Sequence, residues 1–208
     1  MAEVSADYNS VLLRALLMLG GISAAYGVIG YIVASLTRRK LPGIAFLGRY
    51  GLYLFLLLFA EFLVYVFLPS FRDLMRATVA TLVGYVLSLF HVSYSISGAT
   101  ITLQNPPLAF NIDAACLGTM LLWVYAALVL AETKASDKQR IRGILIGFVI
   151  LLAFNFFRIT LSIYLEWLTN IRVHDYFWYF NMVFVLVVWL GWLWSLKRRP
   201  TRLARSLA

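Results

Sequence analysis

Five long apolar stretches, separated by short charged loops, constrain this chain more than any other feature of its sequence. They cover roughly residues 11–36, 50–69, 115–132, 144–168 and 177–196. About 20 apolar residues are needed to cross a bilayer as a helix, whose backbone hydrogen bonds are then satisfied internally. With 62% hydrophobic and 13% charged residues, a soluble fold could not bury this surface. We therefore expect a single-domain, all-α polytopic membrane helix bundle over residues 1–208, with about five to six transmembrane helices.

Basic residues predict the orientation of this bundle. They gather between the first two spans, between the third and fourth, and after the last: Arg38, Arg39, Lys40 and Arg49; Lys134, Lys138, Arg140 and Arg142; Lys197, Arg198, Arg199, Arg202 and Arg205. Five spans place all three groups on one side, which the positive-inside rule makes cytoplasmic. The net charge of +9 is therefore assigned to topology rather than to nucleic-acid binding. We expect a multi-pass protein of the cell (inner or plasma) membrane, with a basic cytoplasmic tail at 197–208.

The N-terminal run is interpreted as a retained span. Residues 11–36 are too long for a cleaved signal peptide, and a basic stop follows them.

Residues 71–90 leave two interpretations open. Apolar residues recur there at helical spacing, whereas Arg72, Asp73 and Arg76 occupy the start. If the segment spanned the membrane, the basic group at 38–40 would lie outside, against the charge rule. An amphipathic helix at the outer interface is favoured.

Residues 92–112 change to a period of two. Apolar residues alternate with serine and then with threonine, and Ser97-Gly98 offers a turn between the two runs. This pattern predicts a short β-hairpin, and residues 109–112 could return as a third strand. Such backbone cannot face lipid, so we expect it on the extracytoplasmic side of the bundle.

The single cysteine, Cys116, follows this segment directly. Asp113 is predicted to cap the third span, which places Cys116 in the first helical turn. A helix N-terminus lowers a thiol pKa, while the neighbouring carboxylate opposes that effect. Gly118 would let another backbone approach closely. The pattern leaves open whether the thiol is reactive or an inert packing residue.

Arg158 lies inside the fourth apolar stretch. An arginine within hydrocarbon is costly and is a candidate functional residue. Its place in the outer half of the bilayer lets its side chain reach toward Cys116, and Asn155 shares its helix face. The alternative is a structural ion pair with Glu61 of the second span.

His174 lies in the outer loop before the last span, beside Asp175. The chain thus brings a thiol, an imidazole and a guanidinium to one membrane face, whereas His91 is not expected to take part. Cysteine with histidine is a pairing for nucleophilic acyl transfer, in which a guanidinium can stabilise the oxyanion. With one Cys and two His, no metal-ligand cluster is predicted, and no phosphate loop or dinucleotide fingerprint appears. No cofactor is expected.

The ordered set of these motifs resembles the exosortase/archaeosortase family of membrane cysteine transpeptidases. The likeness lies in the hairpin that enters a cysteine at a helix start (ATITL…FNIDAACLG), in the intramembrane NFFRI and in the later HDYFWYF. It covers roughly residues 50–196. Leu117 departs from the family pattern, in which a small hydroxyl residue usually separates the cysteine from glycine.

The resemblance implies a function and a set of roles. Members cleave a C-terminal sorting segment, made of a motif, a transmembrane helix and a basic tail, from exported proteins. They then transfer the new carboxyl end to an acceptor such as a lipid anchor. Carried over by motif, Cys116 is the nucleophile, Arg158 the family arginine and His174 the family histidine. Asp113, Asn155 and Asp175 are expected to support them.

A second function remains possible from the sequence. The chain could be a non-enzymatic membrane transporter or assembly scaffold held together by a buried Arg158–Glu61 pair. The cysteine would then be dispensable.

Overall fold

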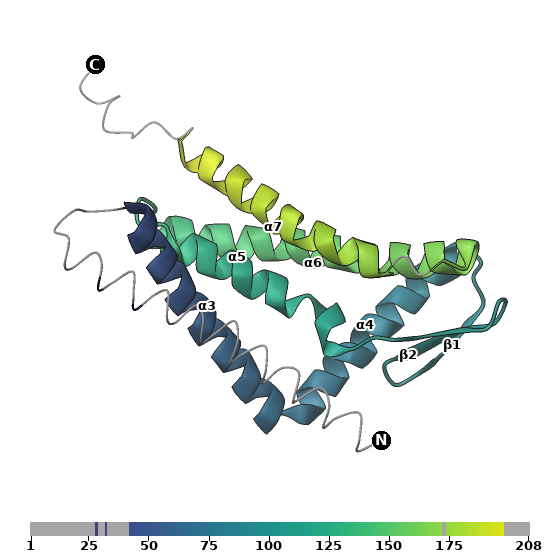
Figure 1. Cartoon of the computed structure of the whole chain (residues 1–208). Coiled ribbons are helices and arrows are strands. Elements are labelled where there is room, and N and C mark those ends of the chain that lie inside the picture. Colours follow the sequence, from purple (N-terminus) through teal and green to yellow (C-terminus); the bar gives the residue numbers. More distant parts are fainter. Residues whose placement is uncertain (1–27, 29–31, 33–41, 172–173, 198–208) are drawn as a thin grey trace.

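The computed structural model describes residues 42–171 and 174–197, together with Val28 and Ile32 (Figure 1). The predicted first span at 11–36 therefore lies outside the described residues, apart from those two helical positions. The described elements are mostly helical: α3 (Pro42–Phe67), α4 (Pro69–Leu89), α5 (Thr119–Ala131), α6 (Asp137–Thr169) and α7 (His174–Lys197). Between α4 and α5 come three strands and a short 3-10 helix, η2 (Ala114–Leu117).

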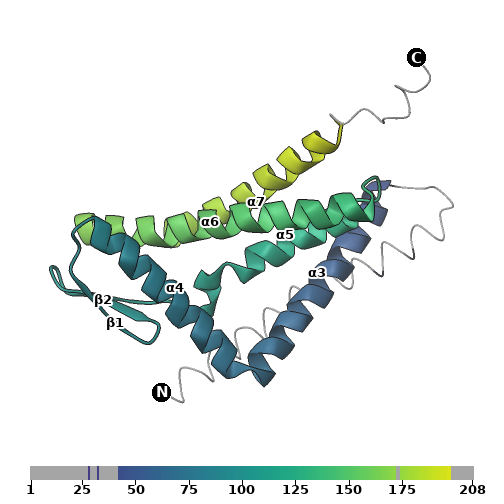
Figure 2. The same cartoon turned by 180° about the vertical axis from the view of Figure 1, so that it is seen from behind.

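Helices α5, α6 and α7 run side by side, and α3 packs against α5 (Figures 1 and 2). Helices α3 and α4 form a V whose vertex is Leu68, because Pro69 begins a new helix at its first turn. Helix α4 then crosses to the far end of α6. The result is an open bundle in which α4 and the strands lie at the end opposite the α5–α6 loop.

Three described helices are long and apolar enough to cross a membrane: Ala45–Phe67 of α3, all of α6, and Phe180–Lys197 of α7. They confirm the second, fourth and last predicted spans. The predicted third span at 115–132 is wrong in length. Helix α5 has only 13 residues, or about 20 Å at ~1.5 Å per residue, against a hydrocarbon core of ~30 Å. Gly118, with φ +73°, separates α5 from η2 and so shortens the helix.

The segment at 71–90 is helical, as predicted, and does not qualify as a candidate span. Its buried residues, Ala80, Val83, Gly84 and Leu87, form one face at helical spacing. The opposite side exposes Leu74, Leu82 and Tyr85. An interfacial position for α4 remains a prediction.

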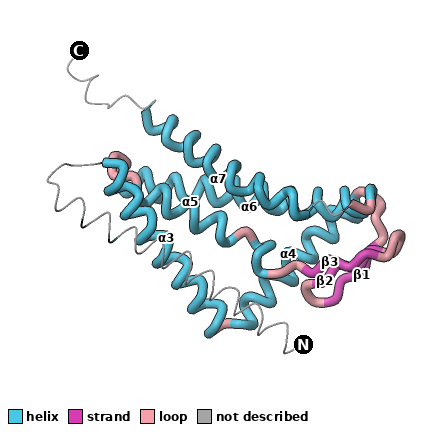
Figure 3. The backbone as a smooth tube through the Cα atoms, in the orientation of Figure 1, coloured by secondary structure: helices cyan, strands magenta, loops and turns pink. Residues whose placement is uncertain are grey.

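The predicted hairpin is present and includes the third strand. Strands β1 (Tyr94–Ser97), β2 (Thr100–Leu103) and β3 (Leu108–Asn111) form an antiparallel sheet in the order β1-β2-β3 (Figure 3). Gly98, at φ +58°, takes the first position of the two-residue turn, where a type II′ turn needs glycine. Trp167 of α6 donates its indole N–H to the carbonyl of Asn105, which fixes the β2–β3 loop against α6.

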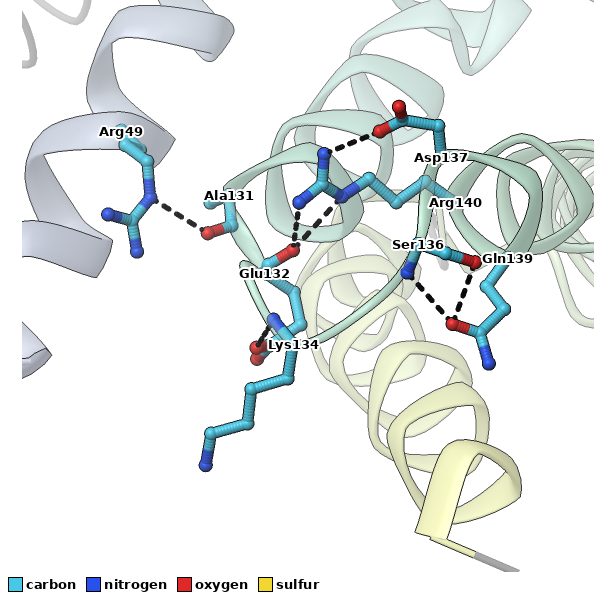
Figure 4. A network of polar contacts seen from close by, with 8 residues as sticks. All are labelled: Arg49, Ala131, Glu132, Lys134, Ser136, Asp137, Gln139 and Arg140. Carbon is cyan, nitrogen blue, oxygen red and sulfur yellow. Dashed lines mark hydrogen bonds and ion pairs between the residues drawn. The ribbon is translucent and has the colours of Figure 1, made fainter. Parts of the chain in front are cut away.

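Polar contacts define the other end of the bundle (Figure 4). Arg49 of α3 donates to the carbonyl of Ala131 at 3.0 Å, which ties α3 to the end of α5. Arg140 donates to the carbonyl of Glu132 from Nε at 3.0 Å and from Nη2 at 2.8 Å. These arginines satisfy carbonyls that the end of α5 leaves unpaired. Two of the predicted inner-side residues thus also hold a helix terminus, while the membrane side itself remains a prediction.

A substitution at Gly84 tests the contact between α4 and the sheet. A Cβ there would lie 2.7 Å from a ring carbon of Tyr94 and 2.8 Å from the terminal carbon of Ile96. We expect Gly84→Leu to lower stability by about 1–3 kcal/mol through overpacking, measured by thermal unfolding in detergent. Gly43→Ala is the matched control, because nothing lies within 4 Å of the added carbon. Equal melting temperatures for Gly84→Leu and Gly43→Ala would contradict this packing.

Candidate functional site

The site begins where the chain leaves β3. Asp113 has extended backbone and accepts a hydrogen bond on Oδ1 from the N–H of Cys116 at 3.0 Å. Asp113 is therefore an N-cap, as predicted, although it caps η2 rather than a spanning helix. The cap holds Cys116 in the single turn of η2, with the side chain 7% exposed.

Arg76 of α4 fixes the same segment from the other side. Its Nε donates to the carbonyl of Ile112 at 2.7 Å, and its Nη2 donates to Oδ1 of Asn111 at 3.1 Å. Asp73 forms an ion pair with its Nη1 at 3.4 Å. Sequence reasoning did not assign Arg76 to the site. The available signal was the charged start of an otherwise apolar helix. It predicted a position at the membrane interface, but not the contact of Arg76 with Ile112, 36 residues away.

Asn155 of α6 connects η2 to the longest helix. Its Nδ2 donates to the carbonyl of Cys116 at 2.8 Å, and the residue is buried. A Cβ at Gly118 would lie 2.7 Å from Cγ of Asn155, so the glycine is needed for this approach as well as for its positive φ. The close approach expected at Gly118 is therefore present, but the neighbour is a side chain rather than a backbone.

Arg158 follows one turn later and is buried, with 3% exposure. Viewed down the axis of α6, Arg158 lies between the directions of Phe154 and Asn155. Phe154 stacks on Phe184 of α7, and Asn155 contacts η2. Its guanidinium is close enough to Cys116 for the two to interact electrostatically. Within the part of the chain that the structure describes, its Nε and Nη1 have no hydrogen-bond partner. The arginine thus has donors that are unpaired among the described residues, close to the thiol.

The alternative pairing of Arg158 with Glu61 is not formed. Glu61 of α3 is buried and accepts a hydrogen bond from Oγ1 of Thr119, the first residue of α5. The hydroxyl of Tyr65 lies 3.4 Å from the same Oγ1. Glu61 is therefore part of a contact that joins α3 to the start of α5, three residues after Cys116.

Of the opposing effects expected on the thiol pKa, those that raise it are the larger. The pKa of Cys116 is raised to about 12, mainly by burial and then by the charge of the Asp113 carboxylate and a side-chain hydrogen bond to it. The backbone hydrogen bond to Asp113 and the charge of Arg158 lower the pKa, but by less. The helix-terminus effect is thus outweighed, and the thiol is protonated at neutral pH. A nucleophilic role needs a base that removes the proton as the sulfur attacks.

Asn181 of α7 is a second residue that sequence reasoning missed. It is buried, and its Oδ1 has no partner among the described residues. The ring stack between Phe154 and Phe184, with centroids 3.7 Å apart, sets the register of the antiparallel helices α6 and α7. Asn181, three residues from Phe184, therefore comes about level with Arg158. An asparagine within an apolar span was the available signal.

His174 and Asp175 are placed only by their backbone. His174 is the first residue of α7, and the side chains of both residues lie outside the described part of the structure. The meeting of His174 with Cys116 stays a prediction. Across the described residues, no three His, Cys, Asp or Glu side chains gather in a way that could hold a metal ion.

Comparison with known protein families identifies a match. The model of a family described as transmembrane exosortase matches residues 8–195, which is most of the chain. No curated protein and no solved structure matches significantly.

The pKa of Cys116 gives two predictions of opposite sign. Asp113→Asn removes the charge that raises the pKa but keeps a capping oxygen. The thiolate is the reactive form, so alkylation by iodoacetamide at pH 8 should accelerate by about tenfold for each unit that the pKa falls. Arg158→Gln should slow it, because a charge that lowers the pKa is lost.

Both rates are measured by mass spectrometry of the purified protein in detergent, with Cys116→Ala as the blank. Slower labelling of Asp113→Asn would contradict the assigned electrostatics.

Proposed function

The chain belongs to the transmembrane exosortase family, and from this premise we propose that it is a membrane-embedded cysteine protease/transpeptidase whose nucleophile is Cys116. Family membership implies a membrane enzyme of protein sorting, which acts on proteins that carry a sorting signal. The substrate would be an exported protein ending in a motif, a transmembrane helix and a basic tail. One observation carries the assignment of the site: the buried Arg158, whose Nε and Nη1 have no partner among the described residues, lies close to the only thiol of the chain.

The chemistry begins with attack of Cys116 Sγ on the scissile carbonyl. As the C–S bond forms, the thiol proton passes to His174 and negative charge develops on the carbonyl oxygen. The tetrahedral intermediate collapses with cleavage of the C–N bond, and His174 returns the proton to the leaving amine. A thioester remains on Cys116, and the amine of an acceptor, such as a lipid anchor, displaces the sulfur. Water in place of the acceptor gives simple hydrolysis.

The raised pKa of Cys116 fits this order of events. A protonated thiol needs the base in the same step, whereas a preformed thiolate would not. Arg158 has two N–H groups unpaired among the described residues, and these can bind the oxyanion as it forms. A donor that is unpaired before the reaction forms its hydrogen bond only when negative charge develops on the carbonyl oxygen. It therefore stabilises the transition state more than the bound substrate.

The register of α6 and α7 supports a role for His174. Extending the Phe154–Phe184 pairing by ten residues brings the first residue of α7 level with about Tyr164. That level is about 9 Å beyond Arg158 along the helix axis, at ~1.5 Å per residue. His174 also precedes the buried Asn181 by seven residues, a spacing that returns to the same helix face.

The scaffold hypothesis loses its main support. It requires a buried Arg158–Glu61 pair, whereas Glu61 instead accepts a hydrogen bond from Thr119. The charge interactions of Arg158 are instead with Asp113 and Cys116, on the segment that carries the thiol.

The first test is loss of processing in cells. Cys116→Ala and Cys116→Ser should leave a tagged substrate uncleaved, and His174→Ala should do the same if it is the base. Leu145→Ala, an exposed position on α6, is the expression control and should process normally. Continued processing by Cys116→Ala would exclude the proposal.

A second measurement separates enzyme from scaffold. The wild-type protein should accumulate a substrate adduct that neutral hydroxylamine releases, as expected for a thioester, and Cys116→Ser should not. An adduct resistant to hydroxylamine would rule out the thioester.

The membrane orientation has its own prediction. In a Cys116→Ala background, Ser97→Cys in the sheet should react with an impermeant thiol reagent added to intact cells. Lys138→Cys, in the first turn of α6, should react only after the membrane is opened. Both native positions are exposed. The opposite pattern would place the site on the cytoplasmic side.

A further inference from the structure

Strand β3 is an edge of the sheet and leads directly into the nucleophile segment. The sheet order leaves one side of β3 without a neighbouring strand in the described structure. Two residues after β3 ends, Asp113 begins the cap that holds Cys116. Among the three strands, β3 alone has this continuity with the thiol.

The hydrogen-bond register identifies which groups of β3 face outward. The N–H of Ile112 donates to the carbonyl of Ala99 at 2.9 Å, so this pair is hydrogen-bonded. Pairs alternate along an antiparallel ladder, so Phe110 and Leu108 also bond to β2, opposite Ile101 and Leu103. The backbone N–H and C=O of Ala109 and Asn111 therefore face away from the sheet. Both of these residues are exposed.

Both ends of β3 are held by other elements. Trp167 of α6 binds the carbonyl of Asn105 before the strand. Arg76 of α4 binds the carbonyl of Ile112 and the side chain of Asn111 after it. The outward groups at Ala109 lie between these anchors. The edge is thus fixed in place before any partner arrives, which reduces the entropy lost on binding.

We infer that the substrate segment next to the scissile bond docks as a fourth strand on the outer edge of β3, in a parallel orientation. This inference rests on the proposed function for the identity of the peptide. The orientation follows because β3 runs toward Cys116, and a substrate whose transmembrane helix follows its cleavage motif must also run toward the bundle. Main-chain hydrogen bonds would supply affinity without a deep groove.

Strand addition predicts a dependence with a period of two in the substrate. Only alternate residues of a strand direct their N–H groups to one neighbour. We would prepare a synthetic copy of the last 35 or so residues of a host exported protein that ends in an apolar helix and a basic tail. N-methyl groups would be placed one at a time along the segment before the scissile bond.

Binding of these peptides to the Cys116→Ser protein in lipid nanodiscs is measured by fluorescence polarisation. Methylation at alternate positions should weaken binding by about 3- to 10-fold each, the value of one hydrogen bond, with little effect at the positions between. Uniform weakening, or none, would overturn the docking mode.

The enzyme side has a matched pair of variants. Ala109→Pro removes an N–H that bonds to no other described strand, and an edge strand tolerates proline, whereas Ala109→Ser retains the donor. We expect Ala109→Pro to weaken peptide binding about 3- to 10-fold and Ala109→Ser to bind as the parent does. The parent for binding carries Cys116→Ser. In proteins that retain Cys116, equal iodoacetamide labelling rates for both Ala109 variants would show that the site remains folded. If the labelling rates are unchanged, equal peptide binding by both variants would exclude the edge of β3 as the docking site.

Because binding is measured without catalysis, the strand-docking inference and the proposed transpeptidase function are tested independently. Alternating N-methyl effects without any wild-type thioester would retain the strand docking and reject the transpeptidase chemistry. A hydroxylamine-sensitive thioester without alternation would do the reverse.

Discussion

The geometry of the candidate site depends on the left-handed turn at Gly118 and on the asparagine that fills the space beside it. Without this turn, residues 114–131 could continue as one helix, and the cysteine would be one more apolar-helix residue. With φ at +73°, the chain instead separates η2 from α5. Asn155 then approaches closely enough to bind the carbonyl of Cys116. One backbone conformation therefore sets the position of the thiol relative to α6.

Arg158 adds an energetic cost to the site that the turn at Gly118 helps to form. A buried guanidinium whose donors are unpaired among the described residues is destabilising unless something compensates it. The anchors around it, Asn155, Arg76 and Asp113, bind backbone groups of the cysteine segment and so hold the thiol and the arginine close together. The free enzyme thus keeps a neutral thiol beside a positive charge. That arrangement favours a reaction in which negative charge appears only after attack.

Local patterns predicted much of the fold. The two-residue period, a turn at Gly98 and a capping role for Asp113 were predicted correctly because each depends on neighbours in the sequence, although Asp113 caps η2 and not a span. The third span was predicted too long, because apolar composition does not reveal the positive φ at Gly118. Arg76 and Asn181 were not assigned to the site, since their places depend on how α4 and α7 pack against other elements. The sequence left the direction of the thiol pKa shift open, because it does not show how deeply Cys116 is buried; burial and Asp113 together raise the pKa.

The sequence by itself determined three things about this chain. It is a membrane protein, its turns and caps lie at predictable positions, and only a few of its residues carry reactive chemistry. These properties follow from apolar run length, periodicity and residue type, which are local. Only the tertiary structure decided that Glu61 binds Thr119 instead of Arg158, and that Asn155 and Arg158 flank the cysteine. Partner choice among buried polar groups depends on the relative position of helices distant in sequence, and no local pattern records that position.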